Sequence, residues 1–296
     1  MKTGFFRALL ALLLSVGSAV VSAAPAPAPV SAPLRVMSFN VRTSNAKDGE
    51  NAWANREELF FETIARFNPD LIGFQEVVAL QREAIEARLP GYVLAGVARD
   101  DGDRKGEWSL IAYRRERFAS VVAGDFWLSE QPDKPGSKSW DAALPRICSW
   151  IRLKEKATGR ELVFANTHFD HRGVVARKEA SRVLSERLAP VAAGVPAILV
   201  GDLNVTEDNP AYLALIQPLT RGGIRWIDSY RTVNPKRSAQ EASFNAFKGT
   251  VEGSRIDFIF HTSHFKATAA TIDRSSRDGR FPSDHYPVTA LLELKK

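Results

Sequence analysis

Short apolar runs recur along the chain and are separated by polar segments rich in turn-forming residues. Each run has the length and the content of β-branched or aromatic residues that are typical of a buried strand. This pattern predicts strands at residues 34–41, 70–75, 108–113, 147–153, 162–167, 197–201, 256–260 and 286–294.

Apolar residues at helical spacing mark a smaller number of segments. Phe60, Ile64 and Phe67 follow one another at intervals of four and three residues, and Asn68-Pro69 ends that helix. The same reasoning predicts helices over residues 55–67, 79–89, 174–188 and 210–216. Many strands with fewer helices favour an α/β or α+β sandwich over a strict alternation of strand and helix.

The first residues have the three-part pattern of a secretory signal peptide. Lys2 and Arg7 precede an apolar stretch, and small residues occupy positions 21–23. The apolar stretch is too short for a membrane span, which needs about 20 residues, and a buried N-terminal helix is the alternative. We therefore expect a signal peptide at 1–23, an extended Ala/Pro-rich linker at 24–33 and a single domain at 34–296.

The formal net charge of +6 raises the question of a polyanionic partner. Cleavage after Ala23 would remove two positive charges and no negative charge, leaving +4. Composition close to the globular average, with 45% apolar and 25% charged residues, excludes disordered, collagen-like and multi-span membrane classes. A single cysteine, Cys148, excludes an intrachain disulfide framework and a cysteine zinc cluster.

Polar groups capable of chemistry stand at the ends of the predicted strands. A carboxylate among apolar strand residues is costly to bury unless it is paired, hydrogen-bonded or bound to a metal. Because ligands in sheet proteins commonly bind beyond strand ends, we expect these side chains to converge. The residues are Asn40, Glu76, His168, Asp202, Asn204, Asp257, Asp284 and His285.

The residue types in this set point to a class of reaction. Carboxylates with Asn and no Cys suit a hard cation, either Mg²⁺ or Mn²⁺. Histidine and aspartate supply proton transfer and charge pairing near neutral pH. Together they suit phosphoryl chemistry, in which a metal neutralises charge developing on phosphate oxygens.

The ordered motifs SFNVR, PDLIGFQE, GEWSLIAYR, NTHFDH, GDLN, RIDFIF and SDHYPV resemble the endonuclease/exonuclease/phosphatase superfamily. The NTHFDH and WDAALPR stretches look most like its deadenylase-like bacterial branch of metal-dependent hydrolases. The resemblance covers nearly the whole chain after the linker. It implies the deoxyribonuclease I-like fold, a four-layer α/β/β/α sandwich of two mixed β-sheets flanked by helices.

The resemblance also implies a metal centre and a first histidine pair. Glu76 would be the main Mg²⁺ ligand, with Asn40 and Asp284 close to the ion or its waters. His285 would act on the phosphate or on the attacking water, and Asp257 would polarise it.

By the same resemblance, the remaining catalytic residues surround the reacting water and the leaving group. Asp202 would orient or deprotonate the water, and Asn204 would hold the water or a phosphate oxygen. His168 would donate to a phosphate oxygen or the leaving group, and Glu107 matches the position that pairs with this histidine. Which histidine is the acid and which the base stays open.

Several further residues have weaker signals. Arg146 is a candidate phosphate contact because a guanidinium binds phosphate with two hydrogen bonds. Asp170 and His171 have either a substrate role or a turn or supporting role. His261 and His264 form an HxxH pattern on a strand and loop, where we expect solvated surface.

Two other function classes remain as alternatives. NTHFDH resembles the end of a binuclear zinc motif, but Asn166 stands where its first histidine would be. A secreted binding protein that keeps the fold without activity is the second alternative, although every expected catalytic position is filled.

The sequence leaves the substrate open. We expect a secreted or periplasmic Mg²⁺-dependent phosphoester hydrolase, monomeric and without a membrane span. Phosphodiesters in nucleic acid are slightly favoured, and a small phosphorylated metabolite or a lipid headgroup is the alternative. The basic residues are scattered and form no dense run for a nucleic acid backbone, as at Arg221, Arg225, Arg231, Lys236 and Arg237.

Overall fold

The computed structural model describes Met1, residues 32–217 and residues 223–295. The predicted signal peptide, apart from Met1, most of the predicted linker, and Arg221 lie outside the described residues. The division into signal peptide, linker and domain therefore stays a prediction. Within the described part of the chain, no helix is long and apolar enough to cross a membrane.

The strands form two six-stranded sheets. The first sheet has the order β11-β12-β1-β2-β4-β3, and the second has the order β5-β6-β7-β8-β10-β9. The strands of the first are β1 (Leu34–Asn40), β2 (Leu71–Val77), β3 (Tyr92–Ala95), β4 (Trp108–Arg114), β11 (Phe265–Ile272) and β12 (Val288–Leu294). Those of the second are β5 (Phe118–Trp127), β6 (Ile147–Glu155), β7 (Glu161–His168), β8 (Ala197–Asp202), β9 (Ile227–Asp228) and β10 (Asp257–His261).

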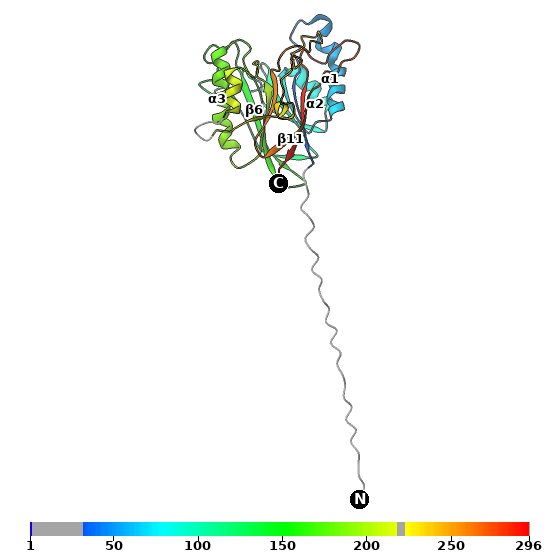
Figure 1. The fold of residues 1–296 in the computed structure, drawn as a ribbon, viewed down its shortest axis with the longest axis vertical. Coiled ribbons are helices and arrows are strands. Elements are labelled where there is room, and N and C mark those ends of the chain that lie inside the picture. Colours follow the sequence, from blue (N-terminus) through cyan, green and yellow to red (C-terminus); the bar gives the residue numbers. More distant parts are fainter. Residues whose placement is uncertain (2–31, 218–222, 296) are drawn as a thin grey trace.

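Helices cover the outer faces of both sheets (Figure 1). The helices are α1 (Trp53–Phe67), α2 (Ala79–Arg88), α3 (Val174–Val191), α4 (Pro210–Ile216) and α5 (Ser229–Val233), with a short 3-10 helix at Gly49–Asn51. Helices α1 and α2 pack on the first sheet through Phe60, Ile64 and Ile85, whereas α3 and α4 pack on the second through Leu184 and Leu215.

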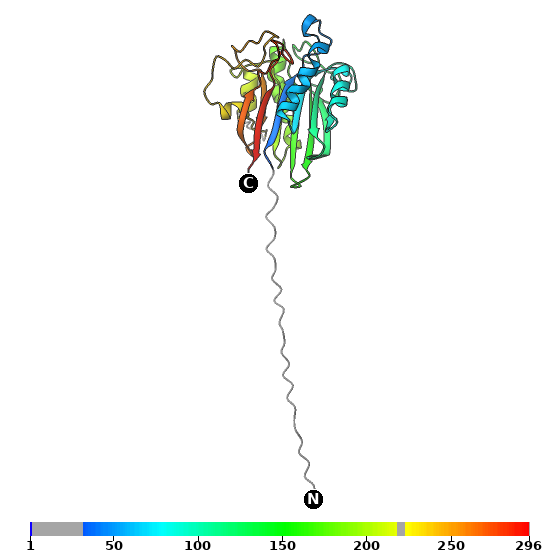
Figure 2. The same ribbon diagram turned by 90° about the vertical axis from the view of Figure 1, so that its right-hand side faces the viewer.

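A third apolar cluster, which includes Val36, Leu71, Phe164 and Ile198, lies between the two sheets. The predicted four-layer α/β/β/α sandwich is confirmed. In Figure 2 the red β12 lies beside the blue β1, so the two ends of the domain meet in one sheet.

All the predicted strands and helices are present, with bounds shifted by a few residues. The sequence pattern missed β3, β5, β9, β11 and α5. Strand β5 lies at the edge of its sheet and exposes Val121 and Val122, so it lacks the buried apolar run that marks a central strand.

The two sheets approach closely at Gly73 in β2. A Cβ atom at this position would lie 2.2 Å from Val200 Cγ2 and 2.7 Å from Asn166 Cγ, so only glycine fits. Asn166 donates from Nδ2 to the carbonyl oxygens of Phe74 and Leu110 in the facing sheet. Asn166 is therefore buried between the sheets as a structural bridge, and the zinc-motif alternative gains no support from its position.

Candidate active site

Strand direction places the predicted site residues at one end of the sandwich. Strands β1 and β2 run parallel in one sheet and β7 and β8 run parallel in the other, so Asn40, Glu76, His168 and Asp202 emerge at the same edge. Strand β10 runs antiparallel to β8, and its first residue, Asp257, pairs with Asp202. The convergence expected from the strand ends is thus confirmed.

Two of these side chains, those of Glu76 and Asn204, are carried by residues with a left-handed backbone conformation. Glu76 has a φ of 64° and lies where the pairing of β2 with β4 shifts register between Phe74 and Val77. Asn204 has a φ of 51° in the turn after β8, where its N–H donates to Asp202 Oδ1. Left-handed backbone is unfavourable for residues other than glycine and commonly marks functional positions.

The converging side chains surround a cavity of about 360 Å³. Of the predicted site residues, the lining includes Glu76, Glu107, Arg146, His168, His171, Asp202, Asn204, Asp284 and His285. Asn40 and Asp257 are fully buried and hydrogen-bond to residues of this lining. The lining also includes residues that the sequence analysis did not select, namely Arg42, Thr43, Arg99, Leu144, Phe244 and Ile256.

Asp202 lies at the centre of the predicted catalytic side chains. Its Oδ2 accepts from Asn40 Nδ2 at 3.0 Å and lies 3.5 Å from His168 Nε2 and 3.8 Å from His285 Nε2. Burial and the nearby charge of Asp257 raise the pKa of Asp202 to about 7. A carboxyl group with this pKa suits proton exchange near neutral pH.

The tautomer of His168 follows from its neighbours. Asn204 Nδ2 donates to the carbonyl oxygen of Phe169, which fixes the orientation of the amide. The same Nδ2 lies 3.0 Å from His168 Nε2, so that ring nitrogen accepts and Nδ1 carries the hydrogen. Burial and the charge of Arg146 lower the pKa of His168 well below its usual value and keep the ring neutral.

His285 is held by Asp257. The His285 Nδ1 atom lies 2.9 Å from Asp257 Oδ2, and both side chains are buried. Burial opposes protonation of the ring, but the charges of Asp257 and Asp202 outweigh it and raise the pKa of His285 well above its usual value. The ring of Phe244 packs edge-on against this imidazole, with centroids 5.1 Å apart. Asp257 therefore holds His285 with its Nε2 atom 3.8 Å from Asp202 Oδ2, and the two carboxylates favour the protonated ring.

Two groups of side chains have the chemistry of a cation site. Glu76 and Asp284 face the cavity with oxygen donors, and Asn40 Nδ2 donates to Glu76 Oε1 at 3.0 Å. Burial opposes the charged form of Glu76, but His285 and the hydrogen bonds from Asn40 and Thr43 lower its pKa overall.

The second group is Asp202, Asp257 and His285, whose ligand atoms lie within 4.8 Å of one another. In this group the Asp257–His285 hydrogen bond occupies His285 Nδ1. An anionic set of oxygen donors open to the cavity fits a hard cation, so we favour Glu76 and Asp284 over the second group.

Glu107 does not form the hydrogen bond with His168 that the family resemblance implies. Its Oε2 instead accepts from Arg99 Nη1 at 2.6 Å. His168 Nδ1 is buried without a hydrogen-bond partner among the described residues. Arg99, which the sequence analysis did not select, therefore pairs with the carboxylate that the resemblance assigned to His168.

Asp170 lies beneath the loops next to the site and does not line the cavity. Its oxygens accept from the N–H groups of Ala143, Leu144, Arg172 and Gly173. Burial opposes ionisation of Asp170, yet these four hydrogen bonds lower its pKa. Its position supports the turn role that the sequence analysis left open.

The two histidines of the HxxH pattern differ in their exposure to solvent. His261 is buried, with 2% of its surface exposed, and its Nδ1 lies 2.9 Å from Ser229 Oγ, so the expectation of a solvated surface is wrong for this residue. His264 is exposed as expected. His261 is the last residue of β10, all five of whose residues are buried, and the apolar run Phe258–Phe260 before it is the signal that could have indicated its burial.

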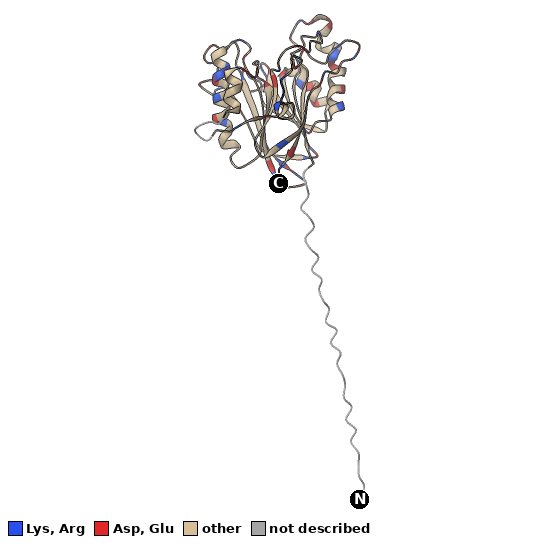
Figure 3. Ribbon diagram, in the orientation of Figure 1, with Lys and Arg blue, Asp and Glu red and all other residues tan. Residues whose placement is uncertain are grey.

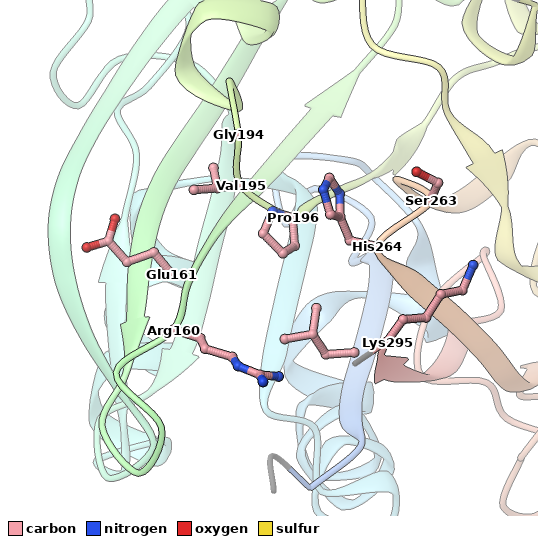
Figure 4. Close-up of a pocket in the computed structure, with 9 residues that line it drawn as sticks. Arg160, Glu161, Gly194, Val195, Pro196, Ser263, His264 and Lys295 are labelled. Atoms are coloured by element: carbon pink, nitrogen blue, oxygen red, sulfur yellow. The ribbon is translucent and has the colours of Figure 1, made fainter. Parts of the chain in front are cut away.

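A larger cavity of about 510 Å³ lies at the opposite end of the sandwich (Figure 4). It is formed where β7 and β8 begin, and Arg160, Pro196, His264 and Lys295 are among the lining residues. None of the predicted catalytic residues lies there, so volume alone does not identify the site.

Figure 3 shows Lys and Arg scattered among Asp and Glu over the outer helices, in agreement with the mild, dispersed charge of the sequence.

The model of the endonuclease/exonuclease/phosphatase family matches residues 37–285, which span nearly all of the sandwich and both ends of the site. The chain belongs to this family. Members of the family are metal-dependent phosphoester hydrolases, and the resemblance read from the sequence is confirmed.

Solved structures of bacterial relatives are similar over nearly their whole length. A family member from Bacteroides thetaiotaomicron has a TM-score of 0.82 and 38% identity, covering 89% of this chain and 98% of the other. A mannosyl-6-phosphatase from the same species has a TM-score of 0.79 and 39% identity, covering 88% and 99%.

Curated sequences match more distantly. Mouse nocturnin is 21% identical over 291 residues, which cover 88% of this chain and 64% of nocturnin. The chain spans less than two thirds of the length of the curated relatives that it matches.

Proposed function

We propose that the protein hydrolyses phosphomonoesters of small, sugar-like molecules. The observation that carries this proposal is the cavity of about 360 Å³, which the predicted catalytic carboxylates and histidines line together with Arg42, Arg99 and Arg146. The 39% identity to a mannosyl-6-phosphatase supports a monoester substrate. Nucleic acid phosphodiesters, slightly favoured by the sequence, are less favoured here, because Lys and Arg are interspersed with Asp and Glu over the described elements visible in Figure 3.

Water attack on phosphorus needs a proton acceptor and groups that fix the water. We infer that Asp202 accepts the proton of the attacking water, because its Oδ2 lies at the centre of Asn40, His168 and His285. His285, held by Asp257, directs Nε2–H toward the negative charge on the phosphate. Asn204 donates to His168 Nε2, which keeps this neutral ring in place 3.5 Å from Asp202 Oδ2.

Glu76 and Asp284, supported by Asn40, would hold a divalent cation, which we propose to be Mg²⁺ with Mn²⁺ as the alternative. When bound, this ion supplies Lewis-acid stabilisation of the charge that develops on the phosphate oxygens. Arg42 stays bound to Asp48 through two hydrogen bonds and lies 3.7 Å from Asp284, which positions that carboxylate.

Apolar side chains at the cavity suit a ring-shaped leaving group. Phe244 is 44% exposed and Leu144 is 39% exposed, and both line the cavity. An aromatic face packs favourably against the C–H groups of a sugar ring. These two side chains would hold the alcohol part of the substrate while the catalytic residues hold the phosphate.

The deciding experiment assays the protein from Ala24 onward against mannose 6-phosphate, bis(4-nitrophenyl) phosphate, plasmid DNA and RNA, with Mg²⁺ or with a chelator. We expect Mg²⁺-dependent release of phosphate from the monoester, with slow or no cleavage of the nucleic acids. Cleavage of nucleic acid with no monoester turnover would restore the phosphodiesterase prediction. Activity that survives the chelator would refute the metal-dependent mechanism.

We also propose that the protein is exported, on the evidence of the signal-peptide pattern in residues 1–23. N-terminal sequencing of protein recovered from the periplasm or medium of an expressing bacterium should begin at Ala24. Recovery of the intact chain from the cytoplasm alone would refute export.

A further inference from the structure

Two guanidinium groups on one wall of the cavity have no place in the catalytic scheme above. Arg99 and Arg146 both line the cavity, yet they are only 7% and 5% exposed. Both also border a small crevice that reaches His168. Buried arginines are rare unless a nearby anion compensates their charge, so the partners of these two decide what they do.

The protein compensates their charge incompletely. Arg99 donates from Nη1 to Glu107, and its Nε lies 3.9 Å from Asp100 Oδ1 without a hydrogen-bond partner among the described residues. Arg146 Nε lies 3.4 Å from Asp170 Oδ2, which already accepts two backbone N–H groups. Arg146 Nη2 contacts only the ring nitrogen of His171, and Nη1 is unpartnered in the part of the chain that the structure describes.

The charge of Arg146 is the less well compensated of the two. Burial and the like charge of Arg99 lower the pKa of Arg146. Its one carboxylate partner, Asp170, contacts Nε alone, so an anionic ligand that bound the rest of the guanidinium would lower the free-energy cost of burying this cation. The wall formed by Arg99, Arg146 and His171 therefore has the character of an anion-binding surface next to the catalytic residues.

Hydrogen bonds hold the backbone at Arg99 in place. The N–H group of Arg99 donates to the carbonyl oxygen of Glu107, and the carbonyl oxygen of Arg99 accepts from Trp127 Nε1 at 2.6 Å. Gly106, with a φ of 93°, closes the turn, and a Cβ there would lie 2.5 Å from the Asp100 carboxyl carbon. A fixed guanidinium loses little conformational entropy when it binds an anion.

We propose that Arg99 and Arg146 recognise the second negative charge of a terminal phosphate and thereby select phosphomonoesters over phosphodiesters. A monoester phosphate presents one more anionic oxygen than a diester, and a guanidinium binds two such oxygens with parallel hydrogen bonds. This inference rests on the proposed function, since it assigns the substrate preference of the same site. It makes Arg99 a specificity-determining residue.

The test compares wild type with Arg99→Gln on mannose 6-phosphate and on bis(4-nitrophenyl) phosphate. Loss of one charged contact should lower kcat/KM for the monoester by about 10- to 100-fold. The value for the diester should fall much less. Arg99→Lys should restore part of the monoester rate, and Arg104→Gln, at an exposed arginine of the same turn that pairs with Glu83, is the matched control.

Measurements of ligand binding test the role of Arg99 independently of whether the protein hydrolyses a monoester. In calorimetric titrations, Arg99→Gln should weaken the binding of inorganic phosphate by a similar factor and leave that of dimethyl phosphate nearly unchanged. This result would support the subsite even if wild type hydrolysed no monoester. An equal loss for both ligands, or no loss for either, in a variant with the wild-type circular dichroism spectrum and unfolding temperature would overturn the inference.

Discussion

Three of the predicted catalytic side chains are each oriented by a second buried residue. Asp257 fixes His285, Asn40 fixes Asp202, and the carbonyl oxygen of Phe169 fixes the amide of Asn204. Burial strengthens these contacts, because a charge or dipole in a poorly hydrated site interacts more strongly than it does in water. The precision of the site therefore depends on residues that do not touch the substrate.

Asp257→Asn tests this dependence at a single residue. The amide keeps the shape of the side chain but removes the charge that stabilises the His285 imidazolium. We expect kcat to fall about 100- to 1000-fold with a much smaller change in KM, within the range that general acid–base groups contribute. Steady-state kinetics measure both values, and Asp101→Asn in an exposed turn is the control. Full activity in Asp257→Asn would show that His285 needs no carboxylate partner.

His261 gives a pH-dependent contribution to stability. Burial lowers its pKa to about 4, against about 6.5 in an unfolded chain. As the pH falls below about 6.5, the unfolded state therefore takes up a proton that the folded state does not. Stability is lost progressively toward pH 4, by an amount on the order of 3 kcal/mol.

The variant His261→Asn should remove this loss while it keeps a polar contact with Ser229. Urea unfolding at several pH values would show the free energy of unfolding falling less steeply for the variant between pH 6.5 and 4. If the free energy of unfolding fell equally steeply for both proteins, His261 would not be the source of this pH dependence.

At the level of elements, the loops that follow β8 and precede β10 are joined by a buried ion-pair network. Arg255 is fully buried and binds Glu207 and Asp228, with Nη2 lying 2.7 Å from Asp228 Oδ2. Its guanidinium also stacks on Tyr230 and Phe258. The network ties the segment after Asp202 to the segment before Asp257, so it holds the two facing aspartates in place.

Arg255→Met should lower the free energy of unfolding by about 3 to 5 kcal/mol, because buried Asp228 loses its cationic partner, whereas Glu207 keeps Arg231 at 2.8 Å. The matched control is Arg182→Met on α3, whose exposed pairs with Glu179 and Glu186 should contribute less than about 1 kcal/mol. Equal losses in urea unfolding of the two variants would show that the network is not stabilising.

The elements also show where sequence reasoning succeeds. Central strands such as β2 and β8 are apolar along their length, so their positions and the polar residues at their ends were predictable. The edge strand β5 and the charge-containing β11 lack that pattern and were missed. The partner of a buried side chain is set by tertiary packing, which is why the Arg99–Glu107 pair could not be inferred from strand ends.

At the level of the whole molecule, the catalytic residues come from both sheets, so the site exists only when the sandwich is assembled. Asn40 and Glu76 belong to the first sheet, whereas Asp202 and His168 belong to the second. Among the hydrogen bonds that the structure describes between these four side chains, only the one from Asn40 to Asp202 joins the two sheets. A ligand that binds groups from both sheets should therefore stabilise the entire fold.

Binding of Mg²⁺ tests that coupling and the choice of ligands together. At a concentration about 100-fold above its Kd, the ion should add about 3 kcal/mol of stability, which raises the unfolding temperature by about 5 to 10 °C. Glu76→Gln should abolish the increase because it removes the main carboxylate donor, whereas Glu83→Gln, an exposed residue on α2, should retain it.

Differential scanning calorimetry of chelator-treated protein, with and without Mg²⁺, measures this shift in each variant. Asp257→Asn distinguishes the two candidate donor groups, because Asp257 belongs only to the group with Asp202 and His285. If the shift survives in Glu76→Gln and disappears in Asp257→Asn, the cation is held by that group and not by Glu76 and Asp284. If Asp257→Asn keeps the shift while losing activity, Asp257 acts through His285 alone, and the metal and proton-transfer functions belong to separate residues of the same cavity.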